Sequence, residues 1–181
     1  MKINFDEKIM RFDELKGFEI VDAIINDFTN KWNITAEIGN EFAAWSKGRE
    51  VQYTLTIIED EHSWFQDSFS AVDPDIVCDP FLSSLMHEIG HIITYKDITD
   101  KDWEIWTKQI EKLESKVTKD MTNEELHKIN LQYFEIPIEK KATVWAATYM
   151  RENASEVADF WQKLQPALLE FYRINNIELN F

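Results

Sequence analysis

The spacing of apolar residues changes along the chain, from mainly alternating in the first half to helical in the second. A helical stripe from Leu15 to Trp32 is followed by segments that read as strands, at residues 33–38, 42–46, 50–59 and 62–71. The alternation is clearest in residues 50–59, where Val51 and Tyr53 flank a polar side chain. We therefore predict an α+β fold in which a small, mainly antiparallel sheet precedes a helical half.

The helical half carries local signals for the ends of its helices. Thr99 with Asp102, and Thr122 with Glu125, have the spacing of a capping box, in which two side chains satisfy free N–H groups of a first turn. Pro166 lies inside the last apolar stripe. We expect it to kink or break that helix, because proline has no N–H group to donate.

The composition fits a single domain spanning residues 1–181. Gly and Pro number four each, so long flexible linkers are not expected, and apolar residues are frequent enough to form a sizeable core. The formal net charge is −15. Because an acidic surface repels phosphate backbones, we predict no direct nucleic-acid partner and favour neutral or basic protein partners.

The location of the protein is predicted from its cysteine usage and its apolar runs. Cys78 is the only cysteine, so no disulfide can form within the chain, which suits a reducing compartment. We interpret it as a small buried residue. Residues 1–7 have no apolar signal-peptide core, and no apolar run reaches membrane-spanning length. We expect a cytoplasmic protein with no membrane partner.

The candidate chemistry begins with the pattern His-Glu-x-x-His at His87. Residues four apart share a face of an α-helix, so the imidazoles of His87 and His91 can converge on one zinc ion. Glu88 leaves the same turn at another angle, which suits it to take a proton from a zinc-bound water. Asp79 as the N-cap and Pro80 as the first residue favour a helix here.

A catalytic zinc ion normally has three protein ligands and one open position, so the histidine pair needs a third ligand. Thr94 and Asp97 exclude a third His at short spacing, which leaves a Glu on a second helix as the remaining common solution. Glu139 is the best candidate, because Pro137 favours a helix that would hold it in the first turn. The small Ala142 would let this helix approach the first one closely.

Several assignments remain open from the residues alone. The helix dipole also favours an acid in a first turn, so Glu139 can be explained without a metal. Thr143, one turn later, could hydrogen-bond a metal ligand. The alternative third ligands are Glu135, Glu104, Asp97 and His127. The candidate donors to a reaction oxyanion are His127, Tyr133, Tyr149 and His62.

Two motifs together resemble those of the ImmA/IrrE-like gluzincin metallopeptidases. That family carries H-E-[IL]-G-H and later E-x-x-A-[ND]-x-F-A, and this chain has the first motif at His87 and a similar one at Glu139. The resemblance extends over about residues 77–150, judged by the extent of the motifs. Thr143 and Trp145 replace the usual Asn or Asp and the usual Phe, which indicates a divergent branch of phage or mobile-element type.

The resemblance implies a zincin-like fold, with the motif helix packed on the sheet, and a zinc-dependent endopeptidase that cleaves an intracellular protein. Zn2+ would be held by His87, His91 and Glu139, with Glu88 as the general base. The family suggests that the protein or peptide substrate is a repressor-type regulator. It also implies that a strand beside the motif helix binds the substrate as an added strand, and residues 64–71 are our candidate.

Two other functions fit the sequence. A zinc-bearing interaction protein could bind a partner without cutting it, because a pseudoenzyme can keep every ligand. An acidic inhibitory protein that mimics nucleic acid would need no metal. The acidic inhibitory protein would contain no zinc, so zinc content distinguishes it from the peptidase. A Glu88→Gln variant distinguishes the interaction protein, whose effect would not depend on that residue. The sequence gives no indication of the oligomeric state.

Overall fold

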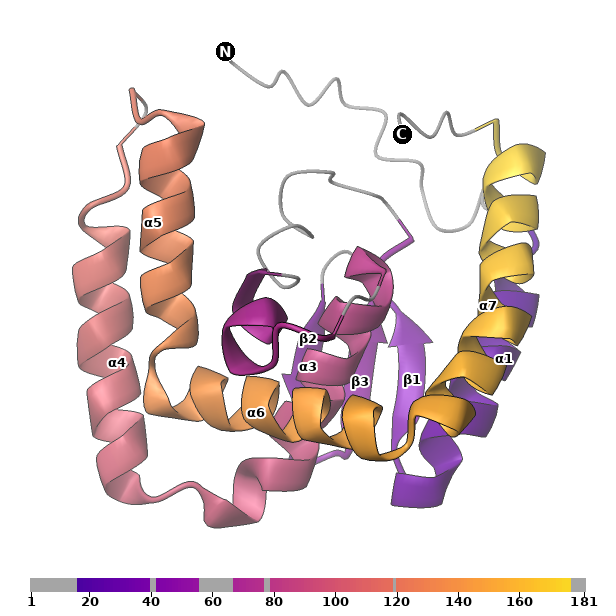
Figure 1. The fold of residues 1–181 in the computed structure, drawn as a ribbon, viewed down its shortest axis with the longest axis horizontal. Helices are drawn as coiled ribbons and strands as arrows, with labels where there is room; N and C mark the ends of the chain where they lie inside the picture. The colour runs from indigo at the N-terminus through magenta and orange to yellow at the C-terminus, as the bar shows by residue number, and fades with distance from the viewer. Residues whose placement is uncertain (1–15, 40–41, 56–66, 77–78, 119, 177–181) are drawn as a thin grey trace.

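The computed structural model describes residues 16–39, 42–55, 67–76, 79–118 and 120–176. Over these residues the fold is α+β and mainly helical, with one small sheet (Figure 1). The main helices are α1 (Phe18–Thr29), α3 (Pro80–Thr94), α4 (Asp100–Glu114), α5 (Asn123–Phe134), α6 (Pro137–Glu152) and α7 (Ala154–Ile174), with 3-10 turns at Asn30–Trp32 and Tyr95–Asp97. No helix within this described part has the length and apolar character needed to cross a bilayer.

The three strands form a mixed sheet in the order β1-β3-β2. β1 (Thr35–Ile38) pairs in parallel with β3 (Glu50–Tyr53), and β2 (Ala43–Trp45) pairs antiparallel with β3. The prediction of a mainly antiparallel sheet is therefore wrong, because β3 returns between the two earlier strands. The central place of β3 buries Val51 and Tyr53 completely. Alternation of apolar residues indicates a strand, but it does not indicate the strand's neighbours.

Residues 67–72 are helical, so the strand predicted for residues 62–71 is wrong over this part, and so is the peptide-binding edge predicted for residues 64–71. Ser68 and Phe69 are both buried. Successive side chains of a strand point to opposite faces, whereas a helical turn can bury two neighbours against the same body. The rest of both predictions lies outside the described residues.

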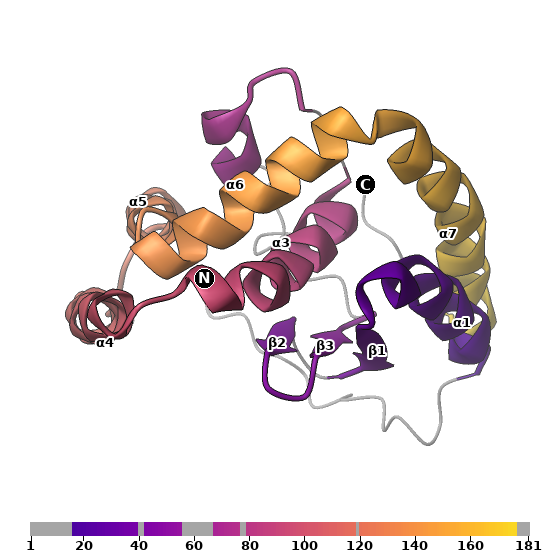
Figure 2. The same cartoon turned by 90° about the horizontal axis from the view of Figure 1, so that it is seen from below.

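Helix α3 lies between the sheet and α6, as the view from below shows (Figure 2). It packs on β2 and β3, and on its other side against α6, while α7 packs along α1. The motif helix therefore packs on the sheet, as predicted. The large hydrophobic core joins α1, the sheet, α3, the C-terminal half of α6, and α7. We call these elements the body.

Helices α4 and α5 form a hairpin that stands at one side of the body (Figure 1). The two predicted capping boxes begin its helices and are confirmed. The Thr99 hydroxyl accepts a hydrogen bond from Asp102 N at 3.2 Å, and the Thr122 hydroxyl accepts one from Glu125 N at 3.3 Å. The buried cluster associated with the hairpin is small and consists of Leu113, Ile129 and Ile136.

Helix α7 continues through Pro166, so of the two predicted outcomes, a kink or a break, the break is wrong. A proline inside a helix removes one backbone hydrogen bond and crowds the carbonyl four residues earlier. Leu164 and Leu168 flank Pro166, and both are buried in the core of the body. This burial stabilises the helix on both sides of the proline.

Candidate metal centre

Helix α3 begins as the sequence predicts and presents both motif histidines together. The Asp79 carboxylate accepts a hydrogen bond from Phe81 N at 2.8 Å, which caps the first turn. His87 and Glu88 are buried, and His91 is partly buried. The Nε2 atoms of the two imidazoles lie 3.0 Å apart. The spacing of four residues therefore brings the two rings together, as expected.

Glu139 comes to the same point from the first turn of α6. Its side chain is almost completely buried, and its Oε2 lies 3.3 Å from His87 Nε2 and 3.0 Å from His91 Nε2. These three atoms form a triangle with edges of 3.0–3.3 Å. Ligand atoms of a tetrahedral zinc site with bonds of about 2.0–2.1 Å lie roughly 3.3 Å apart. The triangle is therefore close to one face of such a site.

Glu88 adds a second carboxylate beside the histidine pair. One oxygen of Glu88 and one ring nitrogen each of His87 and His91 all lie within 4.8 Å of one another. This group could hold a metal ion. Imidazole and carboxylate donors accept several divalent metals, so the geometry by itself does not choose among them.

Thr143 sets the tautomer of His87. Its Oγ1 donates a hydrogen bond to the backbone oxygen of Glu139 at 3.0 Å, and the same Oγ1 lies 3.0 Å from His87 Nδ1. Because a hydroxyl has one hydrogen, Nδ1 must be the donor to Oγ1. The lone pair of His87 is then on Nε2, which faces His91 and Glu139. This is the tautomer that a metal ligand requires.

Gly90 allows α3 and α6 to approach closely enough to form the triangle. A Cβ atom built on Gly90 would lie 2.5 Å from the backbone oxygen of Ala142. Backbone cannot move aside as a flexible side chain can. Ala142 itself is completely buried, which agrees with the prediction that its small size permits close approach.

Glu139 and His91 shift each other's pKa values. Burial alone would raise the pKa of Glu139, but its interactions with His87 and His91 lower it well below its usual range. Burial alone would lower the pKa of His91, but Glu139 and Glu88 raise it overall. Glu139 is therefore ionised and places a negative charge beside the two imidazoles.

Two aromatic residues of the hairpin complete the surroundings of Glu139. The Trp106 indole donates a hydrogen bond from Nε1 to Glu139 Oε1 at 2.7 Å. Burial raises the pKa of the Tyr133 phenol far above its usual value, and the negative charges of Glu139 and Glu88 raise it further. Sequence analysis did not identify this contact. The one available signal was that a buried carboxylate needs donors.

The other candidate residues lie away from the triangle or outside the described part. Three of the alternative third ligands pair with other side chains at the surface, namely Glu135 with Lys140, Glu104 with Lys108 and His127 with Asp67. The fourth, Asp97, is exposed. Tyr149 donates to Glu156 at 2.6 Å, beside the 3-10 turn that follows α1 rather than at the triangle. His62 and Cys78 lie outside the described residues.

Comparison with known proteins gave no match: no family model, no curated protein and no solved structure is similar enough to this chain to be recognised. The residues of the candidate metal centre therefore carry the argument about function.

Proposed function

We propose that this protein is a zinc-dependent endopeptidase of the gluzincin type. The observation that carries the proposal is the triangle of His87 Nε2, His91 Nε2 and Glu139 Oε2, with edges of 3.0–3.3 Å. The resemblance of its motifs to the ImmA/IrrE-like metallopeptidases supports the same assignment. In this proposal the three residues are the metal ligands, and Glu88 stands beside them as the general base.

The donor set fits zinc in a catalytic role. Two imidazoles and one carboxylate leave a fourth position open, which is the usual arrangement of catalytic zinc and differs from closed structural sites. Hydrogen bonds with other side chains also position the ligands, since Thr143 orients His87 and Trp106 donates to Oε1 of Glu139. Such supporting hydrogen bonds are typical of metal ligands.

The reaction would follow from the positions of the chain's own residues. Bound zinc would supply Lewis acidity, which polarises a peptide carbonyl and lowers the pKa of a water molecule. Glu88 is buried and adjacent to His87, so it can take a proton from that water and pass it to the leaving amine. Tyr133, whose phenol interacts with Glu139 beside the triangle, is our candidate donor to the developing oxyanion.

The substrate class follows from the resemblance and from charge. We propose a protein or peptide substrate, with a repressor-type regulator as the specific candidate. The net charge of −15 favours a substrate that is neutral or basic near the cleavage site. It disfavours direct binding of the phosphate backbone of a nucleic acid.

Zinc content and cleavage, measured together, test the proposal. The wild type should bind one zinc ion per chain and cleave members of a proteome-derived peptide library, detected by mass spectrometry of new N-termini. Glu88→Gln should keep the zinc and reduce cleavage by about 10²–10⁴-fold, the usual contribution of a general base. Glu139→Ala should lose affinity for zinc. Glu104→Gln, at an exposed acid of α4, is the matched control and should change neither property.

Three results would contradict the proposal in different ways. A wild type that takes up no zinc would remove the metal and favour an acidic inhibitory protein. Zinc in the wild type without cleavage of any peptide or protein would favour a metal-bearing interaction protein. Cleavage that survives in Glu88→Gln would remove that residue as the general base.

A further inference from the structure

We propose that Trp106 is a positioning residue for the metal site and that it couples the α4–α5 hairpin to metal binding. This inference rests on the proposed metal-binding function and adds a regulatory connection to it. The indole N–H of Trp106 would bind one oxygen of Glu139 and so direct the other oxygen at the metal. Metal binding would in turn fix the position of the hairpin.

The two oxygens of Glu139 have different partners. Oε1 accepts a hydrogen bond from Trp106 Nε1 at 2.7 Å, which is short for an N–H···O bond and typical of a charged acceptor. Oε2 lies within 3.3 Å of both histidine Nε2 atoms. A carboxylate held in this way presents one oxygen to a metal and is prevented from binding through both.

Loss of the indole N–H would affect the ligand oxygen as well. Glu139 is almost completely buried, so a missing donor leaves a carboxylate oxygen without compensation from water. The last torsion of a Glu side chain has a broad energy minimum, so the carboxylate can rotate to find another partner. That rotation moves Oε2 away from the position between the two histidines.

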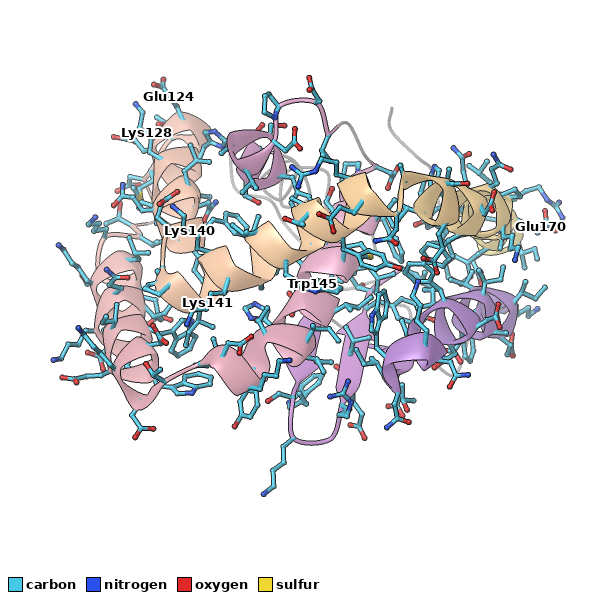
Figure 3. All side chains as sticks on the ribbon, turned by 60° about the horizontal axis from the view of Figure 1, so that its bottom comes forward. Glu124, Lys128, Lys140, Lys141, Trp145 and Glu170 are labelled. Atoms are coloured by element: carbon cyan, nitrogen blue, oxygen red, sulfur yellow. The ribbon has the colours of Figure 1, made fainter. Side chains whose placement is uncertain are left out.

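The hydrogen bond also joins two parts of the fold. Trp106 belongs to α4, and its ring packs on the small cluster formed by Leu113, Ile129 and Ile136. Figure 3 shows the start of α6, marked by Lys140 and Lys141, where it lies beside the hairpin. Lys141 adds a second connection to α4, through an ion pair with Asp102 at 2.8 Å. Fixing Glu139 on a metal would therefore restrain α4 through Trp106.

Zinc affinity, measured by competition with a chromogenic chelator, tests the positioning role. Trp106→Phe keeps an aromatic ring and removes the N–H, and we expect it to weaken zinc binding by about 10–100-fold. Trp103→Phe is the matched control on the same helix. Its ring lies edge-on to Trp106 with centroids 5.9 Å apart, whereas the hydrogen bond to Glu139 comes from Trp106. The zinc affinity of Trp103→Phe should therefore stay within about threefold of wild type. Equal affinities in the two variants would overturn the role of Trp106 and leave the proposed function intact. Absence of zinc from the wild type would overturn both.

Hydrogen exchange in the wild type tests the coupling without depending on any variant. Peptides from α4 should exchange several-fold more slowly with zinc than without it, while peptides from α7 should be unchanged. In Trp106→Phe with saturating zinc, this difference in α4 should shrink. If α4 of the wild type exchanges at the same rate with and without zinc, the hairpin is not coupled to the metal and the inference is wrong.

Discussion

The body and the hairpin are stabilised to very different extents. In the body, one continuous core joins α1, the sheet, α3, α6 and α7, and residues such as Leu85 and Val51 are completely buried. In the hairpin, the buried cluster consists of Leu113, Ile129 and Ile136, and most side chains of α4 are exposed or half-buried. Elements with few buried apolar contacts open at lower free energy than the rest of a domain.

The candidate metal centre lies where these two regions meet. His87, Glu88 and His91 are on a helix of the body. Glu139 opens α6, and its carboxylate is held by Trp106 of the hairpin. The histidine pair is therefore fixed by the large core, whereas the third ligand depends on the less stable region. A movement of the hairpin can therefore shift Glu139 while the histidine pair keeps its position.

Truncating one core residue in each region should give the largest difference in the free energy of unfolding between body and hairpin. Leu85→Ala removes a completely buried side chain of the body and should lower the free energy of unfolding by about 3–4 kcal/mol. Ile129→Ala acts in a small cluster that can relax and should lower it by about 1–2 kcal/mol. Urea unfolding of the zinc-free proteins measures both values. Equal losses would show that the hairpin is as firmly packed as the body.

A close approach of helices offers a second test of the body. Gly90→Ala would place a Cβ 2.5 Å from Ala142 O, so α3 and α6 must separate. We expect the free energy of unfolding to fall by about 1–3 kcal/mol, as for other overpacked sites. Zinc affinity should fall too, because Glu139 moves with α6. Gly48→Ala is the matched control, since its nearest contact is 3.2 Å to the flexible side chain of Glu50. A neutral Gly90→Ala would mean that the helices separate at no cost.

Local signals in the sequence predicted the parts of this structure that depend on local interactions. Both capping boxes were confirmed, because a Thr and an acid three residues apart complete a first turn by themselves. The convergence of His87 and His91 follows from helical spacing. The meeting with Glu139 was reached because a buried histidine pair needs a partner and Pro137 marks a helix start.

The features that were missed depend on contacts between distant residues. The parallel pairing of β1 with β3 is decided by where β3 returns in the sheet. The helix at residues 67–72 depends on what buries Ser68 and Phe69. The bond from Trp106 to Glu139 joins residues 33 positions apart. Spacing within a short segment carries no information about such partners.

The support that α6 gives to the histidine pair can be tested at Thr143. Thr143→Val removes the acceptor for His87 Nδ1–H and should weaken zinc binding by about tenfold, the lower end of the usual range for such supporting contacts. Thr143→Ser keeps the hydroxyl and serves as the control, with affinity close to wild type. Isothermal titration with zinc compares the two. If Thr143→Val and Thr143→Ser bind zinc equally, the tautomer of His87 is set by another group.

The smallest effect on stability should come from a surface ion pair within the body. This pair contrasts with the buried hydrogen bond that joins the hairpin to Glu139. Lys31 of the turn after α1 pairs with Glu156 of α7, and Tyr149 of α6 donates to the same carboxylate at 2.6 Å. Hydrogen bonds from Lys31 and Tyr149 lower the pKa of Glu156, whereas burial lowers the pKa of Lys31 despite the pairing. The pair thus offsets the cost of burying Lys31, and Glu156→Gln should cost only about 0.5 kcal/mol at pH 7.

The sign of its pH dependence follows from the lowered pKa of Glu156. A carboxylate whose pKa is lower in the folded state contributes its full stabilisation above its unfolded pKa of about 4.3. The contribution disappears as the pH falls through the lower folded pKa. Thermal unfolding of wild type and Glu156→Gln between pH 7 and pH 3, in low salt, should therefore show two curves that converge at acid pH. Curves that stay parallel would show that Glu156 acts through packing, and the ionic connection between α1, α6 and α7 would then contribute nothing to the stability of the body.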